Sequence, residues 1–334
     1  MIIRKVKKII KRIIYRIYYS YPSYQVYDFF QRLSGYKKEK QRFFKLLGYT
    51  PDIKNPNSFN EKVLWKKIYD RNPILPIITD KYKVREYLKY VLGKKEAEKI
   101  LIPLLYVTDK PENISFDNLL EEYIIKPSHK SRKYIIAKKK AEQKKYTLVE
   151  GSKSIELFDS TETRNEIISI CKEWLLTPHG FYRHEWAYQK INRKIVIEKL
   201  LNDATGKIPD DYLFYVFNGK CKMILVVYDR FSDKSRSYYT PEWEKIPIKG
   251  HIKEAGNYKR PEKLESMINL AEWLGKNFDF IRVDLYLLNN NIYFGELTSY
   301  PMSGTNPLNP VSYDYKIGEN WQLCPGYWKK LCKY

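Results

Sequence analysis

Cysteine and histidine are scarce in this chain, and neither residue type forms a metal-binding or redox pattern. The 334 residues include four histidines and four cysteines, which are Cys171, Cys221, Cys324 and Cys332. No two cysteines have the C-x-x-C spacing, so the sequence predicts neither a disulfide framework nor a zinc site and favours a reducing compartment. The serines and histidines form no recognisable nucleophile arrangement.

Long apolar runs are absent, and acidic residues are outnumbered. No run of about twenty apolar residues occurs, so no segment is expected to span a bilayer. The chain has 61 Lys and Arg against 39 Asp and Glu, a formal net charge of +22. This excess indicates anionic partners such as nucleic acid, lipid headgroups or acidic metabolites. Part of it is compositional, since an AT-rich genome favours Lys, Ile, Asn and Tyr together. With 43% hydrophobic residues, the chain is globular rather than disordered.

The first sixteen residues, "MIIRKVKKIIKRIIYR", carry seven Lys or Arg and no acidic residue. Aliphatic residues recur at helical spacing, which predicts an amphipathic helix over residues 1–20 lying on an anionic membrane surface. A secretory signal fits less well, because lysines interrupt the apolar residues and no small-residue cleavage site follows. A nucleic-acid-binding arm is the other alternative, although such an arm does not need so many aliphatic residues.

The remaining chain alternates helical and strand patterns, which predicts an α+β protein with a mixed sheet. Ser58 and Glu61 form a capping-box signature for one helix, and a second helix is expected from near Thr79 to Gly93. Residues 138–154, "KKKAEQKKYTLVEGSKS", are expected to form a solvated basic insertion or a mobile loop. The expected divisions are a membrane helix at 1–20, an N-terminal helical or α/β region at 21–105, a main domain at 106–320 and a tail at 321–334.

The stretch "RVDLYLLNNNIYFGELT", residues 282–298, predicts a β-hairpin. Asparagine tolerates the left-handed conformation that tight turns need, and apolar and aromatic residues flank the three asparagines. With the loop centred on Asn290, the cross-strand pairs are Arg282–Thr298, Asp284–Glu296 and Tyr286–Phe294. Because side chains alternate between faces, these six residues share one face, and Val283, Leu285 and Leu297 lie on a core face.

Two carboxylates about 5 Å apart at Cβ are destabilising unless something offsets their repulsion. Protonation, a neighbouring arginine or a hard divalent cation would each do so. Mg²⁺ typically takes one or two protein carboxylates and completes its coordination with water and substrate phosphates. Alternatively, the pair is screened by solvent on an exposed face, or a one-residue shift in register separates it.

Two strand ends carry further candidate residues. Lys126 follows the apolar strand "YII" and precedes a polar turn, where a lysine can hold a phosphate as a point charge. Glu198 and Lys199 end the strand pattern "IVIEK", whose backbone can face a purine edge. Taken alone, Lys126 is explained as an ordinary surface lysine, and Glu198 and Lys199 are explained as the end of a strand that meets a loop.

The order of these segments resembles the ATP-grasp superfamily, and in particular its TupA-like branch of polysaccharide biosynthesis. The segments that carry the resemblance cover roughly residues 58–305 and include "SFNEKVLWKKIYDRNP", "TDKYKVREYL", "YIIKPSHKS", "IVIEKLL", "VVYDRFSDKSR" and "FIRVDLYLLNNNIYFGELTSYPMSG". The last is the most specific, with R-V-D, G-E-L-T and P-x-S-G all present. The resemblance implies an ATP-grasp fold of two α+β subdomains that grip a nucleotide, with ATP and Mg²⁺ as cofactors.

The resemblance also implies roles for individual residues. Arg85 and Lys126 would hold the nucleotide phosphates, and the backbone around Glu198, Lys199 and Leu200 would face the adenine. Asp284 and Glu296 would carry Mg²⁺, with Thr298 in place of the asparagine that many relatives have as third ligand. Arg282 would stabilise charge that develops on the transferred phosphoryl group.

The sequence departs from the family pattern at two places. The glycine-rich phosphate loop expected after Lys126 is replaced by "HKSRKY", which contains no glycine and cannot adopt the same open conformations as readily. Phosphate contacts would then come from Lys130, Arg132 or Lys133. Leu213 also stands where the family pattern has a lysine.

The resemblance implies an ATP-dependent carboxylate–amine ligase of cell-surface glycan assembly, acting through an acyl phosphate. Its expected partners are a glycan or lipid-linked sugar acceptor, an amino acid or uronic acid, and the anionic inner face of the plasma membrane, with no specific nucleic acid. The alternatives are a non-catalytic scaffold or regulator with a degenerate nucleotide site, a transferase-type glycan-modifying enzyme, and a basic nucleic-acid-binding protein that uses tyrosines as stacking platforms.

Overall fold

The computed structural model describes residues 21–140, 143–151, 153–230, 233–250, 252–256, 258–324 and 326. These residues form two compact units, which we call unit 1 (Met1–Arg42 and Leu104–Lys199) and unit 2 (Phe43–Pro103 and Leu200–Tyr334). The predicted membrane helix at 1–20 lies outside the described residues. The domain boundaries expected from the sequence stay predictions.

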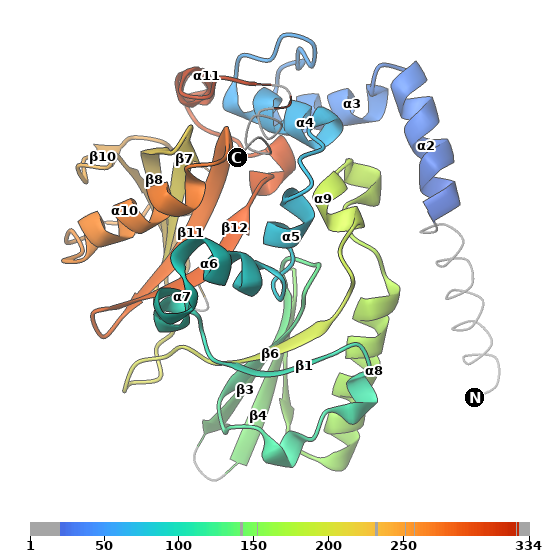
Figure 1. The fold of residues 1–334 in the computed structure, drawn as a ribbon, viewed down its shortest axis with the longest axis vertical. Coiled ribbons are helices and arrows are strands. Elements are labelled where there is room, and N and C mark those ends of the chain that lie inside the picture. Colours follow the sequence, from blue (N-terminus) through green and yellow to red (C-terminus); the bar gives the residue numbers. More distant parts are fainter. Residues whose placement is uncertain are drawn as a thin grey trace. The chain divides into compact units, whose positions relative to one another are not determined.

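Unit 1 is built on a six-stranded antiparallel sheet with the strand order β1-β6-β2-β3-β4-β5 (Figure 1). The helix α8 covers one face of this sheet and contributes Ile167, Cys171 and Trp174 to its buried core. The elements of unit 1 are α2 (Tyr21–Leu33), the first part of α3 (Lys37–Leu47), β1 (Leu104–Thr108), η1 (Pro111–Asn113), η2 (Phe116–Asn118), β2 (Tyr123–Pro127), β3 (Lys133–Lys140), β4 (Gln143–Glu150), β5 (Lys153–Phe158), α8 (Thr161–Leu176), η3 (Phe181–Arg183), α9 (Trp186–Gln189) and β6 (Ile195–Lys199).

The expectation that residues 138–154 form a solvated insertion or mobile loop is wrong. Most of this stretch belongs to β3, β4 and β5, which pair in a continuous meander. Tyr146 is buried in the core of unit 1, and Leu148 packs against that core. Apolar residues at alternate positions of β4 therefore decide its structure, whereas Lys145 lies on the opposite face of the same strand.

Unit 2 contains a second six-stranded antiparallel sheet, with the order β10-β9-β8-β7-β11-β12. The α+β class is confirmed, but the expected mixed sheet is wrong, because all ladders between the described strands are antiparallel. The elements of unit 2 are α4 (Phe59–Tyr69), α5 (Leu75–Thr79), α6 (Val84–Leu92), α7 (Lys94–Ile100), β7 (Asp211–Phe217), β8 (Lys220–Tyr228), β9 (Ser235–Tyr239), β10 (Lys245–Ile246), α10 (Leu264–Gly275), β11 (Phe280–Leu288), β12 (Asn291–Thr298), η4 (Pro301–Gly304) and α11 (Ser312–Glu319).

The two faces of the unit 2 sheet have different roles. Helix α10 packs on one face, where Gly275 lies against Val216 and Ile281 (Figure 1). Directly paired residues of neighbouring strands share a face, so the register places the following residues on the opposite face, which we call the site face: Arg282, Asp284, Tyr286, Asp211, Leu213, Tyr215, Leu225, Val227, Arg236 and Tyr238.

Of the three helix ends predicted in unit 2, two are confirmed and one is wrong. The capping box of Ser58 and Glu61 is present at the start of α4. Helix α6 ends at Gly93 as expected, but it begins at Val84 rather than near Thr79. The Asp80 carboxylate accepts hydrogen bonds from the backbone N–H groups of Tyr82 and Lys83, which fixes a turn before the helix.

A buried ionic network joins α4 to the start of β11. The Lys66 ammonium lies 2.7 Å from the Asp70 carboxylate and 2.6 Å from that of Asp279. Asp279 also accepts hydrogen bonds from the Trp321 indole and from the backbone N–H of Phe280. These side chains are all buried, so the network holds segments together that are more than 200 residues apart in sequence.

Within the described residues, every helix is too short or too polar to cross a membrane.

Candidate active site

The β11–β12 hairpin brings the two predicted carboxylates together. Asp284 pairs with Glu296 and Arg282 pairs with Thr298, as the sequence predicts. The turn residues Asn289 and Asn290 both have positive φ values, 48° and 60°. This is the two-residue turn that suits the twist of a hairpin.

The expected pairing of Tyr286 with Phe294 is wrong. The register shifts by one residue after Asp284, so that Tyr286 pairs with Tyr293 and Phe294 pairs with Leu285. The extra residue lies at Gly295, where a Cβ would come within 3.0 Å of both the Asp284 carbonyl oxygen and the Tyr286 ring. Glycine therefore permits a bulge that leaves the two carboxylates in register and moves Phe294 opposite the core residue Leu285.

Arg282 offsets the repulsion between the carboxylates. Its guanidinium donates two hydrogen bonds to Asp284, at 2.7 and 2.6 Å, and its Nη2 also lies 3.3 Å from Glu296 Oε1. Thr298 Oγ1 accepts a hydrogen bond from Arg282 at 3.0 Å and donates one to Glu296 at 2.9 Å. A bidentate arginine–carboxylate pair fixes orientation as well as charge.

The environment shifts the pKa values of the two carboxylates in opposite directions. Burial raises the pKa of Asp284 to about 7, against the opposing effect of the Arg282 guanidinium. Burial also acts on Glu296, but Lys81 and Arg282 outweigh it and hold the pKa of Glu296 at about 2. Pairs of carboxylates with separated pKa values are a common arrangement for proton-transfer and charge-stabilising chemistry.

Around this cluster, three residues were not identified from the sequence, Asp211, Arg230 and Lys81, and Tyr286 was placed on the charged face without a role. Asp211 and Tyr286 are neighbours on the site face, and Arg230 Nε lies 3.0 Å from Asp211 Oδ2. Burial raises the pKa of Asp211, which Arg230 and a hydrogen bond from Tyr286 partly counteract. Lys81 Nζ lies 3.9 Å from Glu296 Oε2. The signals were present, because Lys81 belongs to "TDKYKVREYL" and Arg230 to "VVYDRFSDKSR".

The oxygen donors of the hairpin fit a hard divalent cation. Asp284 and Glu296 supply carboxylates and Thr298 supplies a hydroxyl, whereas within the part of the chain that the structure describes no group of three His, Cys, Asp or Glu side chains is placed to hold a metal. Such a donor set suits Mg²⁺, which needs only one or two protein carboxylates. The Glu296 side chain is 39% exposed, so its carboxylate is accessible from solvent.

Two other residues of unit 2, Arg85 and Leu200, have predicted contacts with the nucleotide, and both lie outside the hairpin. Arg85 lies on α6, and its Nη2 donates a hydrogen bond to the Ile102 carbonyl at 2.9 Å. Leu200 is buried directly after β6. Leu213, the departure from the family pattern, lies on β7 directly opposite Asp284. An apolar side chain therefore lines the site face beside the carboxylates.

In unit 1, Lys126 and Glu198 form an ion pair. Lys126 Nζ lies 2.5 Å from Glu198 Oε2, since the β2–β6 register places Ile124 opposite Glu198 and Lys126 two residues further along the same face. Glu198 is buried, and Lys199 ends β6 as an exposed residue. The nucleotide roles of Lys126, Glu198 and Lys199 stay predictions.

The glycine-free loop after Lys126 is short and partly buried. Only residues 128–132 separate β2 from β3, and Arg132 takes a left-handed conformation with φ 57°. His129 and Lys130 are both buried, with contacts to Thr177. Burial lowers the pKa of Lys130 to about 7. Phosphate contacts by Lys130, Arg132 or Lys133 stay predictions.

Comparisons with known proteins identify the family. The sequence model of the TupA-like ATP-grasp family matches residues 61–322. No curated protein matches the sequence.

Similar solved structures include two D-alanine–D-alanine ligases and one RiPP-associated ATP-grasp ligase. The ATP complex of the ligase from Bacillus anthracis is 14% identical, with a TM-score of 0.36 and coverage of 67% of this chain and 55% of the ligase. The Helicobacter pylori ligase is 15% identical, with a TM-score of 0.38 and coverage of 79% and 65%. The Chryseobacterium gregarium RiPP-associated ATP-grasp ligase, solved with ADP and peptide, is 10% identical, with a TM-score of 0.37 and coverage of 78% and 64%.

The chain thus spans between 55% and 65% of the length of these three ligases. The family match covers most of the chain and contains the hairpin with Arg282, Asp284 and Glu296. This protein belongs to the TupA-like ATP-grasp family.

Proposed function

We propose that this protein is an ATP-dependent ligase that joins a carboxylate to an amine in cell-surface glycan assembly. The observation that carries the proposal is the charge cluster on the β11–β12 hairpin, where Arg282 bridges Asp284 and Glu296 within a matched family domain. A buried arrangement of this kind binds and orients charged reactants, because electrostatic interactions are stronger away from bulk water.

In the proposed reaction, ATP transfers its γ-phosphoryl group to a substrate carboxylate, which gives an acyl phosphate and leaves ADP. An amine then attacks the acyl carbon, the bond to phosphate breaks, and an amide and inorganic phosphate result. Asp284, Glu296 and Thr298 would hold Mg²⁺, which neutralises phosphate charge when bound. Arg282 would orient Asp284 through its two hydrogen bonds and stabilise charge on the transferred phosphoryl group.

The first test is a calorimetric titration of ATP into the purified protein with and without Mg²⁺. We expect magnesium-dependent binding by the wild type and at least a tenfold weaker affinity in Glu296→Gln. The loss of a partner that merely supports a metal ligand already costs ~10–100-fold in affinity. The matched control is Glu265→Gln, which removes the charge of an exposed glutamate on α10 in the same unit.

Two outcomes would contradict the proposed site. Equal affinities of the wild type and Glu296→Gln would show that this carboxylate holds no metal–nucleotide complex. If the wild type binds no nucleotide, even with membrane extract present as a source of acceptor, a non-catalytic scaffold becomes the better explanation. The glycine-free loop at residues 128–132 would then be part of a degenerate nucleotide site.

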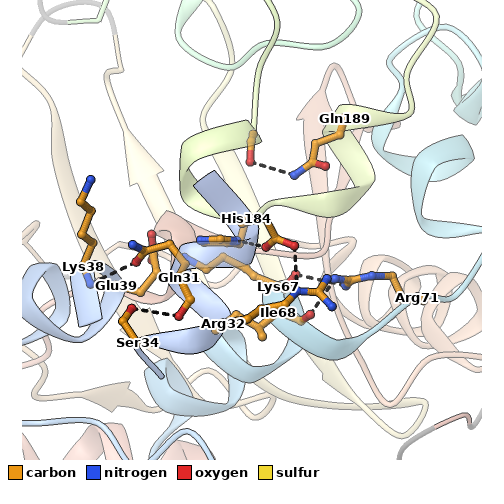
Figure 2. Close-up of polar contacts among 12 residues, drawn as sticks. Gln31, Arg32, Ser34, Lys38, Glu39, Lys67, Ile68, Arg71, His184 and Gln189 are labelled. Carbon is orange, nitrogen blue, oxygen red and sulfur yellow. Dashed lines mark hydrogen bonds and ion pairs between the residues drawn. The ribbon is translucent and has the colours of Figure 1, made fainter. Parts of the chain in front are cut away.

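We further propose that the protein works at an anionic membrane surface, and α2 supports this location. One face of α2 is held within unit 1, since the Asp28 carboxylate lies 3.1 Å from His184 Nδ1 and Tyr27 stacks on the His184 ring. At the C-terminal end of α2, Ser34 Oγ donates a hydrogen bond to the Gln31 carbonyl, and the Lys38 backbone N–H donates one to Gln31 Oε1 (Figure 2).

The other face of α2 is apolar and exposed. Its four large apolar side chains have the helical spacing i, i+3, i+4, i+7 and are between 57% and 69% exposed; they are Val26, Phe29, Phe30 and Leu33. An exposed apolar stripe that continues directly from a basic, aliphatic segment suits insertion between anionic lipid headgroups.

The membrane proposal predicts the result of a sedimentation assay with lipid vesicles. We expect the wild type to bind vesicles that contain anionic lipid, and the Phe29→Ser/Phe30→Ser variant to bind at least about tenfold more weakly, because two phenylalanines no longer enter the lipid. Phe158→Ser is the control, since Phe158 is an equally exposed phenylalanine on β5. Equal binding of the α2 variant and the wild type would contradict this role for α2.

A further inference from the structure

Arg236 is a buried cation without an anionic partner on the site face of unit 2. It lies on β9 and is only 8% exposed. In the part of the chain that the structure describes, its guanidinium forms no ion pair, its Nε has no hydrogen-bond partner, and its one aromatic contact is with the Tyr238 ring at 5.6 Å. Burying an unpaired charge is costly, so an uncompensated arginine at such a position indicates a missing anion.

The guanidinium borders a cavity of about 320 Å³. Among the described residues, the walls carry three cationic side chains and one carboxylate, and the lining residues are Arg236, Ile248, Lys249, Gly250, Ile252, Lys253 and Glu254. The carboxylate of Glu254 is paired with Lys245 at 2.8 Å, and Lys253 is paired with Asp233 at 2.7 Å. The cavity therefore has a net positive charge, and its volume lies at the lower end of the range for small-molecule sites.

The backbone at Gly250 keeps the arginine in place. A Cβ at this position would lie 1.7 Å from Arg236 Nη2 and 2.8 Å from its Cζ. The guanidinium thus rests directly against the glycine backbone, and any larger residue would displace it. The surrounding chain is fixed by hydrogen bonds that link the Arg236 backbone to Lys253 and Ala255.

Sheet register connects this cavity to the carboxylate cluster. Arg236 pairs with Val227 on β8, Val227 pairs with Asp211 on β7, and Asp211 pairs with Tyr286 on β11. All four residues lie on the site face.

We propose that Arg236, with Lys249, forms a subsite for an oxyanion, a carboxylate or a phosphate, on the acceptor substrate. Arginine presents a planar fork of donors that matches either group, and a charged hydrogen bond formed in a buried site is strong. Assigning the anion to the acceptor rests on the proposed ligase function. The acceptor would then be an acidic sugar or a sugar phosphate, held on the same sheet face as Asp284 and Glu296.

The test is a titration of three sugars of similar size into the full-length protein without nucleotide. Glucuronate carries a carboxylate, glucose 1-phosphate carries a phosphate, and glucose is neutral. We expect at least one of the two anions to bind and glucose to bind at least about tenfold more weakly, as for the loss of a charged hydrogen bond. The anion that binds more tightly identifies the group on the acceptor.

Two variants separate the subsite from general effects on folding. Arg236→Gln is expected to weaken binding of the preferred anion by at least about tenfold and to melt at the wild-type temperature or higher, because it removes an uncompensated buried charge. Gly250→Ala is expected to weaken binding while the charge is retained. Arg260→Gln, at an exposed arginine paired with Glu265, is the control and should bind as the wild type does.

The proposal is overturned if neither anion binds to the wild type, if glucose binds as tightly as the anions, or if Arg236→Gln keeps the wild-type affinity. Because the titration contains no nucleotide, its result is independent of the Mg²⁺·ATP titration. Failure of the anion subsite and failure of the ligase function can therefore be told apart.

Discussion

Replacing Lys66 with methionine is expected to lower the free energy of unfolding of unit 2 by about 3–5 kcal/mol. Methionine fills a similar space but leaves Asp70 and Asp279 buried without their shared cation. Removal of one partner from a buried ion pair has a large effect because the remaining charge is neither solvated nor paired. Urea denaturation followed by tryptophan fluorescence is a suitable measurement, since Trp321 contacts this network.

Two further variants show whether uncompensated charge is the cause. Lys89→Met removes a partly exposed lysine that pairs with Glu86 on α6, and we expect it to change stability by less than about 1 kcal/mol. Adding Asp279→Asn to Lys66→Met should restore part of the lost stability, because one of the two carboxylates that faced the Lys66 ammonium is then neutral. A double variant less stable than the sum of both single effects would contradict this explanation.

The largest effect on activity is expected for Asp284→Asn. Asparagine has nearly the same shape, but it cannot accept two charged hydrogen bonds from Arg282 or supply a carboxylate to a cation. We expect magnesium-dependent ATP turnover to fall by ~10²-fold or more, the range seen when one preorganised electrostatic contact is removed from an active site. Turnover should be measured as phosphate release with membrane extract as the source of acceptor.

A structural effect of this substitution must be distinguished from a chemical one. Asp117→Asn, at an exposed aspartate paired with Arg164, is the matched control and should retain wild-type turnover. The melting temperature of Asp284→Asn should be recorded beside its turnover, because Arg282 loses its principal partner. A folded Asp284→Asn protein with full turnover would show that this carboxylate takes no part in the reaction.

The sequence was a good guide to the hairpin because the signals there are local. The asparagine turn and the alternation of residues correctly predict the pairs Asp284–Glu296 and Arg282–Thr298. The one-residue shift that follows depends on how close a Cβ at Gly295 would come to Tyr286, which is a tertiary contact with no signature in the pattern. The sequence therefore predicted the paired residues of the hairpin but not the steric cause of the shift in register.

Composition was a poor guide where buried and exposed residues of one type alternate. The lysines of residues 138–154 suggested a loop, although Tyr146 and Leu148 anchor β4 in a core. Lys66 is one of three lysines on α4, yet it is completely buried between Asp70, which caps the same helix, and the distant Asp279. Asp211 and Arg236 lie on the site face because of the order of the strands in the sheet, which sequence alone does not provide.

The Lys66–Asp279 contact cannot form until late in the synthesis of the chain. Asp279 is 213 residues beyond Lys66, so at ~5–20 residues per second it leaves the ribosome roughly 10–40 s after its partner. By then both segments of unit 1, which end at Lys199, have already been made. Both segments of unit 1 can therefore be complete before β11 and Trp321, which enclose α4, have been synthesised. Nascent chains that stop before Asp279 then expose the buried face of α4.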